Sequence, residues 1–141
     1  MSAEQIAAWE KVCDKVHEND GKIVMQIMHC GRIAAAANKP DSARTLAPST
    51  VHAAGKMYTD TDGMVEHDVP LEMTLEDIEQ TINDYATAAQ KAINIGFDGV
   101  ELHATSGYLP AQFLSTGTNQ RKDAYGGSLG NRLKFLSLIH I

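Results

Sequence analysis

Two pairs of polar side chains have the residue types and spacing to do chemistry. Gln26 and His29 lie toward the end of one apolar stretch, and His103 and Tyr108 follow another. A histidine that donates a hydrogen bond, beside a tyrosine that donates a proton, is suited to reducing a bond conjugated to a carbonyl. The same spacing also fits an ordinary half-buried histidine satisfied by a backbone carbonyl, with Tyr108 anchoring a loop.

Gln26 is the polar residue for which the sequence most clearly predicts a specific partner. It lies within Lys22–His29, which is too short for a typical helix and apolar on both sides, as a strand in a parallel sheet must be. We therefore expect Gln26 to be buried, and a buried amide without hydrogen bonds is costly. Its partner is either another group of the protein or a cofactor.

A helix is expected before this strand. Ser2 and Gln5 form a capping-box signature, and apolar residues then recur at helical spacing. The pattern ends in the segment 17–21, where we expect Gly21 to adopt the left-handed conformation that closes a helix.

A second helix and strand lead to His103. Thr74 with Asp77 predicts a helix N-cap, and an apolar stripe continues to Gly96, where the helix stops. The strand 99–103 follows at once, and Ser128 begins a last helix.

The element order, helix, strand, helix, strand, helix, predicts right-handed crossovers and a parallel sheet. A doubly wound sheet and a βα-barrel both satisfy this pattern, and both gather catalytic groups at the carboxyl ends of the strands. Residues 33–72 look irregular apart from Asp62-Gly63, which is typical of a hairpin turn. Connections this long are usually functional.

Composition restricts the function further. The 141 residues carry 12 Lys and Arg against 18 Asp and Glu, a net charge of −6, which fits one domain with a sizeable core. The scattered cations argue against nucleic-acid binding, and no apolar run is long enough to cross a membrane. The acidic N-terminus is unlike a signal peptide, so we expect a cytoplasmic protein. Cys13 and Cys30 are expected to be buried thiols.

Two other ligand sites receive less support. Residues 125–128 could hold a phosphate at a helix N-terminus, but they lack the P-loop lysine and favour a plain turn and cap. The histidines and Cys30 lack the spacing of metal ligands, so no metal site is expected.

An ordered series of motifs runs through the chain. These are Gln26–Arg32, Met57–Asp60 with Gly63-Met64, Gly96–His103, Gly107–Leu109, Gln112–Ser115, Asn119–Arg121, Asp123, Tyr125–Ser128 and Asn131-Arg132. Over nearly its whole length the chain closely resembles the Old Yellow Enzyme family of FMN-dependent ene reductases.

The resemblance implies a (β/α)8 TIM barrel with FMN and NAD(P)H as cofactors and a small-molecule enone or enal as substrate. Gln26 matches the glutamine that hydrogen-bonds the flavin's pyrimidine edge. His103 matches the histidine that donates to the substrate carbonyl, and Tyr108 matches the tyrosine that protonates the α-carbon. An oligomer is compatible with this family.

Two residues depart from the family pattern. Ser106 stands where asparagine or histidine usually supplies a second carbonyl donor, and loss of one such donor can cost about 10² to 10³ in rate. Met28 stands where an aromatic residue is common, which predicts a softer substrate pocket wall and a different substrate range.

Length is a third departure, because a βα-barrel needs about 250 residues. The resemblance implies that residues 1–141 are a fragment of a single FMN-binding barrel domain, from roughly the second helix through the fourth, without activity of its own. Residues 136–141 match one translation of a transposase adapter used in sequencing libraries, which we interpret as a foreign tail. Two alternatives are a non-catalytic half-barrel acting through association, and a barrel enzyme using His103 and Tyr108 without flavin.

Overall fold

The computed structural model describes residues 2–140, and these divide into two compact units. Unit 1 combines Met1–Ile27 with Asn83–Leu102, and unit 2 combines Met28–Ile82 with His103–Ile141. Helix α2 (Leu75–Asn94) contributes residues to both units. Within the described part of the chain, no helix joins the length and the apolar character that a bilayer crossing requires.

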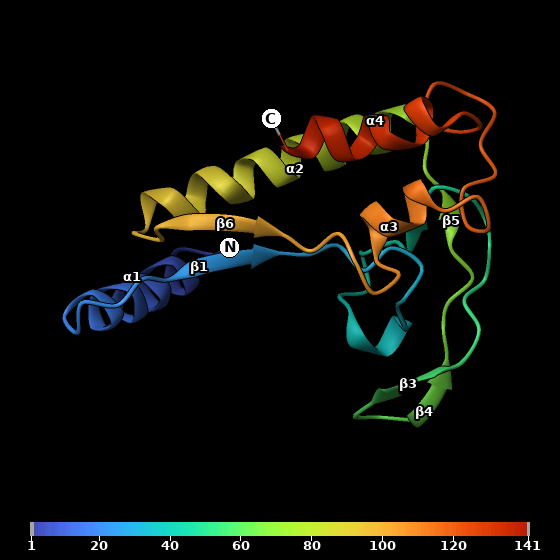
Figure 1. The fold of residues 1–141 in the computed structure, drawn as a ribbon. Coiled ribbons are helices and arrows are strands. Elements are labelled where there is room, and N and C mark those ends of the chain that lie inside the picture. The colour runs from blue at the N-terminus through green and yellow to red at the C-terminus, as the bar shows by residue number, and fades with distance from the viewer. Residues whose placement is uncertain (1, 141) are drawn as a thin grey trace. The chain divides into compact units, whose positions relative to one another are not determined.

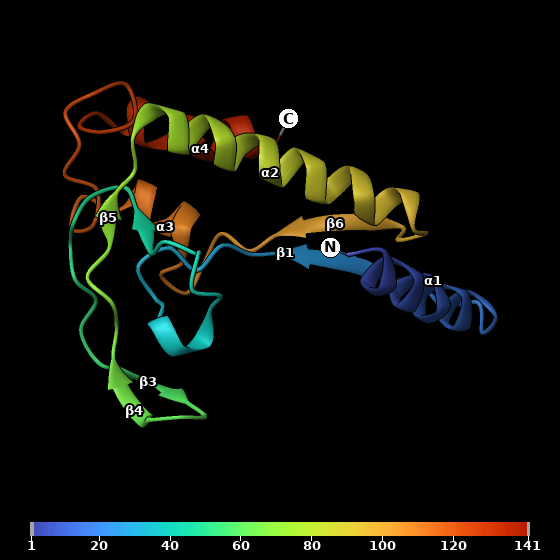
Figure 2. The same cartoon turned by 180° about the vertical axis from the view of Figure 1, so that it is seen from behind.

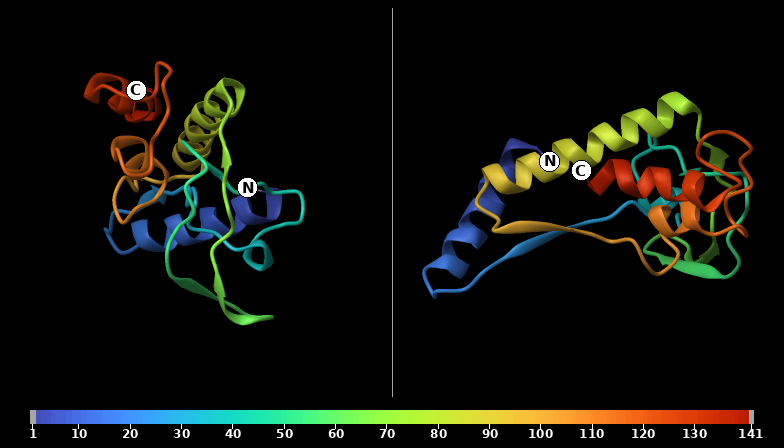
Figure 3. Two further views of the ribbon diagram at one scale, coloured as in Figure 1. Left: turned by 90° about the vertical axis from the view of Figure 1, so that its right-hand side faces the viewer. Right: turned by 45° about the horizontal axis from the view of Figure 1, so that its top comes forward.

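Unit 1 contains the expected pair of parallel strands. Besides part of α2, its elements are α1 (Ala3–His17), β1 (Val24–Ile27) and β6 (Gly99–Leu102). Strands β1 and β6 pair in parallel (Figure 1), and the right-hand view of Figure 3 also shows them side by side. In the register, Val24 stands opposite Gly99. This register confirms the parallel arrangement predicted from the alternation of helices and strands.

The core of unit 1 is small, and α1 contributes one of its residues, Cys13. Its buried members are Cys13, Ala92, Ile95 and Phe97. The Trp9 ring packs 5.5 Å from the Phe97 ring although Trp9 is 41% exposed. Burial raises the pKa of the Cys13 thiol, which is free, as expected for a small buried residue.

Helix α1 starts and ends where predicted, but Gly21 does not adopt the expected conformation. Ser2 and Gln5 exchange both hydrogen bonds of the capping box. Beyond the helix it is Asp20, with φ 56°, that takes the left-handed conformation, so the prediction for Gly21 is wrong. Gly21 instead lets the backbone pass close to the Val16 side chain, because a Cβ at Gly21 would lie 2.8 Å from a Val16 methyl group.

Unit 2 contains two short sheets and three further helical segments. They are η1 (Ala36–Asn38), β2 (Leu46–Ala47), β3 (Lys56–Thr59), β4 (Gly63–Glu66), β5 (Leu71–Glu72), α3 (Leu109–Leu114) and α4 (Leu129–His140). Strand β2 pairs in parallel with β5, while β3 and β4 form the hairpin predicted at Asp62-Gly63 (Figure 2).

Helix α3 was not expected from the sequence, although Pro110 in its first turn is a usual start signal. Helices α3 and α4 pack together, with the Phe113 and Phe135 rings stacked 4.3 Å apart. The expected tail from residue 136 continues α4 through His140 and includes the buried Ile139, while Ile141 lies outside the described residues.

Candidate active site

The structure brings His103 and Tyr108 together in unit 2. Their ring centroids lie 5.0 Å apart with the planes tilted by 52°, and both residues are half-buried. His103 directly follows β6, and Tyr108 is the N-cap of α3, its N–H donating to the Thr105 carbonyl at 3.2 Å. A turn between a strand end and a helix start therefore presents an imidazole and a phenol side by side.

Ser106 lies between them in a backbone conformation unusual for serine. Its φ is 56°, in the left-handed region that asparagine and glycine tolerate better than most residues. The residue is exposed, and its Oγ lies 3.4 Å from the Thr105 Oγ1. The turn thus carries two adjacent hydroxyl groups, those of Thr105 and Ser106.

Gln26, in unit 1, is exposed, so the prediction that it is buried is wrong. Among residues 2–140, β1 hydrogen-bonds to β6 alone, and the strand alternates exposed and half-buried positions instead of burying both faces. The Gln26 Nε2 donates to the Glu101 carboxylate at 3.1 Å. The predicted specific partner within the protein is therefore Glu101, which stands opposite Gln26 in the strand register.

Met28 lines a cavity of about 320 Å³ in unit 2, shared with Cys30, Lys39 and Met57, and is itself 49% exposed. The Lys39 Nζ donates to Asp68 at 2.6 Å and to Thr45 at 2.7 Å. Partial burial works against the charged form of Asp68, but the Lys39 and Thr45 hydrogen bonds outweigh it and lower the pKa. The lysine charge beside the cavity is thus already paired.

Cys30 is a free, half-buried thiol beside this cavity, and burial raises its pKa. A protonated thiol is a poor nucleophile at neutral pH. Cys30 thus lines the cavity wall without being fully buried, so the expectation of a buried thiol holds for Cys13 and not for Cys30.

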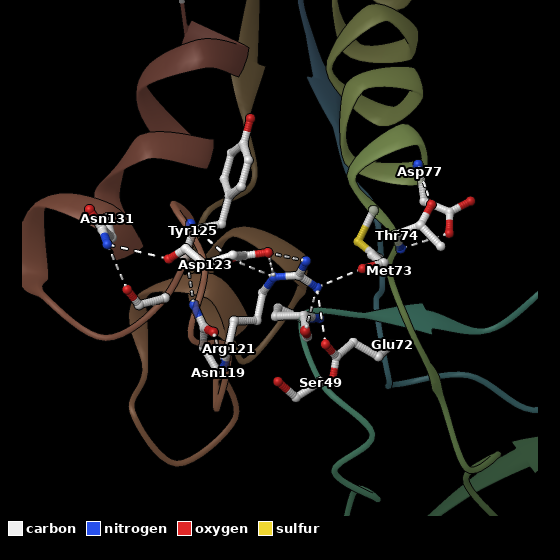
Figure 4. A network of polar contacts seen from close by, with 12 residues as sticks. Ser49, Glu72, Met73, Thr74, Asp77, Asn119, Arg121, Asp123, Tyr125 and Asn131 are labelled. Carbon is white, nitrogen blue, oxygen red and sulfur yellow. Dashed lines mark hydrogen bonds and ion pairs between the residues drawn. The ribbon is translucent and has the colours of Figure 1, made fainter.

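A buried arginine joins three segments of unit 2 (Figure 4). The Arg121 side chain is 5% exposed, and its Nη1 donates to the Pro48 carbonyl at 3.0 Å and the Met73 carbonyl at 2.6 Å. Its Nε donates to both Asp123 oxygens at 3.1 Å, which holds the pKa of that carboxyl below its usual range. Arg121 belongs to the motif 119–121, but its position in the sequence does not predict this role.

The segment 125–128 before α4 forms a turn that ends in a helix cap at Ser128, as the sequence favoured. Ser128 Oγ accepts the Asn131 N–H at 3.2 Å, and the Asn131 side chain donates to the Gly126 carbonyl. A Cβ on Gly126 would lie 2.2 Å from the Arg121 carbonyl oxygen. Close backbone packing against Arg121 therefore accounts for Gly126 without a phosphate.

A charged cluster in unit 1 is built on Asp98. Its carboxylate accepts from His17 Nε2 at 2.8 Å, from the Ile23 N–H at 2.9 Å and from Lys22 Nζ at 2.9 Å, beside a cavity of about 260 Å³. The His17 hydrogen bond first, then those of Ile23 and Lys22, lower the pKa of Asp98 far below its usual value. Asp98 thereby joins the end of α1, the start of β1 and the residue before β6.

Comparison with known proteins gives one consistent result. The pattern of the NADH:flavin oxidoreductase / NADH oxidase family matches residues 1–139. A probable flavin mononucleotide-dependent alkene reductase of Leishmania infantum is 42% identical over 94% of the chain and 38% of its own length. A flavin oxidoreductase of Emericella nidulans, hxnT, is also 42% identical, over 94% of the chain and 33% of its own length.

Solved structures show the same relationship. Morphinone reductase in complex with tetrahydroNAD superposes with a TM-score of 0.93 at 37% identity, covering 99% of this chain and 40% of that one. The old yellow enzyme homologue from Zymomonas mobilis gives 0.91 at 36% identity, covering 98% and 38%. The chain spans about two fifths of the length of these proteins.

Proposed function

Because the chain belongs to the NADH:flavin oxidoreductase / NADH oxidase family, as a partial α/β barrel, we propose that it is part of an enzyme of defined chemistry. This enzyme is an FMN-dependent oxidoreductase that reduces the C=C bond of α,β-unsaturated carbonyl compounds with NAD(P)H. The contact between His103 and Tyr108 is the single observation that carries the proposal.

The residue types in this contact fit the two demands of the reaction. FMN, when bound, supplies a hydride to the substrate's β-carbon. Negative charge then builds on the carbonyl oxygen, where an N–H of His103 stabilises the transition state more than the ground state. The Tyr108 hydroxyl gives its proton to the α-carbon and recovers one from solvent, so that one hydride and one proton saturate the double bond.

Gln26 is the residue of this chain that we assign to FMN. Its exposed amide carries both a donor and an acceptor, which suits the alternating carbonyl and imide groups of the flavin's pyrimidine edge. One such hydrogen bond contributes about 0.5 to 1.5 kcal/mol, against roughly 8 kcal/mol for micromolar affinity. We therefore expect the isolated chain to hold FMN weakly or not at all.

A chimera tests the proposal with a complete barrel. Residues 2–135 replace the matching segment of morphinone reductase, and the purified protein is assayed for bound FMN and for NAD(P)H oxidation dependent on 2-cyclohexenone. We expect a yellow protein that reduces the enone. In the chimera, His103→Ala is expected to keep the flavin and lose turnover by about 10² to 10³.

Two outcomes would count against the proposal. One is a chimera that folds and binds FMN but reduces no enone or enal. The other is a His103→Ala chimera with unchanged turnover, which would show that this histidine takes no part in polarising the substrate. Gln26→Leu serves as the matched probe of the flavin contact, and it should weaken FMN retention more than it changes turnover of the loaded enzyme.

A further inference from the structure

Gln112 is a buried amide next to the turn that carries His103 and Tyr108. It lies in α3 of unit 2, and only 1% of the residue is exposed. A glutamine buried to this extent needs partners for all its polar atoms, because an unpaired amide in the interior is costly. The hydrogen-bond partners of the Gln112 amide therefore indicate what this side chain does.

Gln112 connects two loops that are far apart in the sequence. Its Nε2 donates to the Gly107 carbonyl at 2.7 Å and to the Cys30 carbonyl at 3.0 Å. Its Oε1 accepts the Arg32 N–H at 3.1 Å. The amide thus joins the turn 103–108 to the loop 29–32, and both its donor hydrogens and its acceptor are used.

The backbone at Gly31 leaves room for the Gln112 side chain. Gly31 has φ 60°, and a Cβ there would lie only 2.1 Å from the Gln112 Oε1. The Leu109 N–H, one residue past Tyr108, donates to the His29 carbonyl at 2.9 Å. The two loops therefore meet at Gln112 and again at the first residue of α3.

We propose that Gln112 is a positioning residue that holds Tyr108 and His103 in mutual contact by tying the turn 103–108 to the loop 29–32. Its catalytic meaning rests on the proposed function, because the turn matters for chemistry only if Tyr108 donates a proton there. The geometric part of the proposal stands on this chain alone and needs no flavin.

Asn119 provides a matched control within the same unit. It is 4% exposed, donates to the Phe113 and Tyr125 carbonyls at 2.8 Å and 2.7 Å, and accepts the Arg121 N–H at 3.1 Å. Like Gln112, it joins two backbone carbonyls and one backbone N–H, but not those of the turn 103–108. A loss of stability common to any buried amide will therefore occur in both variants.

The experiment compares Gln112→Met with Asn119→Leu in the 141-residue chain by amide hydrogen exchange and NMR. In Gln112→Met we expect the Leu109 N–H to exchange at least tenfold faster while the Arg121 N–H keeps its rate. Asn119→Leu should give the reverse. The ring-proton shifts of His103 and Tyr108 should change in Gln112→Met and stay in place in Asn119→Leu. Gln112→Glu keeps the acceptor for the Arg32 N–H but loses both donors to the Gly107 and Cys30 carbonyls, so it should move the same signals at least as far.

Three results would overturn the proposal. The first is an equal rise in exchange at Leu109 and Arg121 in Gln112→Met, and the second is unchanged ring shifts in that variant. The third is loss of folding in both Gln112 variants while Asn119→Leu folds, which would assign Gln112 to the stability of the whole unit. Neither flavin nor enone enters the measurement, so the result is independent of the chimera test of function.

Discussion

Asp98 in unit 1 and Arg121 in unit 2 each join three segments of chain, but in opposite surroundings. The Asp98 side chain is 24% exposed and meets Lys22, which is 79% exposed, whereas the Arg121 side chain is 5% exposed. The Asp98 contacts lie where water competes and salt screens charge. Arg121 donates to the Pro48 and Met73 carbonyls in buried surroundings.

The two units therefore hold their segments together in different ways. In unit 2, where His103 and Tyr108 lie, Arg121, Asn119 and Gln112 are buried, and each donates to backbone carbonyls of other segments. Removing one member of such a set leaves others unpaired, so its effect exceeds that of an exposed ion pair. Unit 1 should therefore tolerate the loss of its charged cluster better than unit 2 tolerates the loss of Arg121.

Arg121→Met should have the largest effect. It leaves the Pro48 and Met73 carbonyls without their donor and Asp123 without its guanidinium, and we expect a loss of about 3 to 5 kcal/mol in the unfolding free energy of unit 2. Urea denaturation followed by the amide signals of α3 and α4 measures it, with the exposed Lys122→Met as control. The fluorescence of Trp9, the chain's only tryptophan, follows unit 1 in the same titration. If Arg121→Met lowers the unfolding free energy of unit 2 by less than about 1 kcal/mol, the buried contacts of Arg121 stabilise no more than exposed ion pairs do.

Gly31→Ala should rank second. A left-handed non-glycine residue costs about 1 to 3 kcal/mol, and here the new Cβ also meets the Gln112 amide. Gly63→Ala measures the cost of the left-handed conformation alone, because Gly63 has φ 67° and an added Cβ there would have no atom within 4 Å. We expect Gly31→Ala to be the more destabilising by about 1 kcal/mol, one lost hydrogen bond. Equal losses of unfolding free energy in the two variants would show that the Gln112 side chain can move away from the new Cβ without loss of stability.

Asp98→Asn should have the smallest effect, confined to unit 1. Since the folded protein lowers the pKa of Asp98, its contribution is complete above the unfolded pKa of about 3.9 and disappears as the pH falls below it. Trp9 fluorescence in urea should show a lower midpoint for Asp98→Asn at pH 7 and a shrinking difference in stronger acid. A difference that persists unchanged into strong acid would mean that the Asp98 carboxylate is not the source of the stability.

Local signals in the sequence predicted the ends of the elements well. The caps at Ser2, Thr74 and Ser128 and the turn at Gly63 depend on residues within a few positions of each other, and all form. Gly21 is an exception, because Asp20 adopts the left-handed conformation one residue earlier. Such a shift of one residue depends on packing against Val16, which spacing does not reveal.

The partners of buried polar groups could not be predicted in this way. Gln112 bonds to the Arg32 N–H across 80 positions, and Arg121 bonds to the Pro48 carbonyl across 73. Gln26 was expected to be buried because its strand is apolar, yet exposure depends on which elements cover each face. His103 and Tyr108, five positions apart on one turn, were predicted as a pair because their contact is local.

Under the proposed function, Tyr108 is the proton donor in a flavin-dependent reduction of enones. Stopped-flow measurement of the two half-reactions of the chimera, with and without Tyr108→Phe, tests it most directly. Only the step that consumes the enone needs a proton at carbon, so the variant should slow flavin re-oxidation by 2-cyclohexenone and leave flavin reduction by NAD(P)H nearly unchanged. Equal slowing of both half-reactions, or of neither, would contradict the claim.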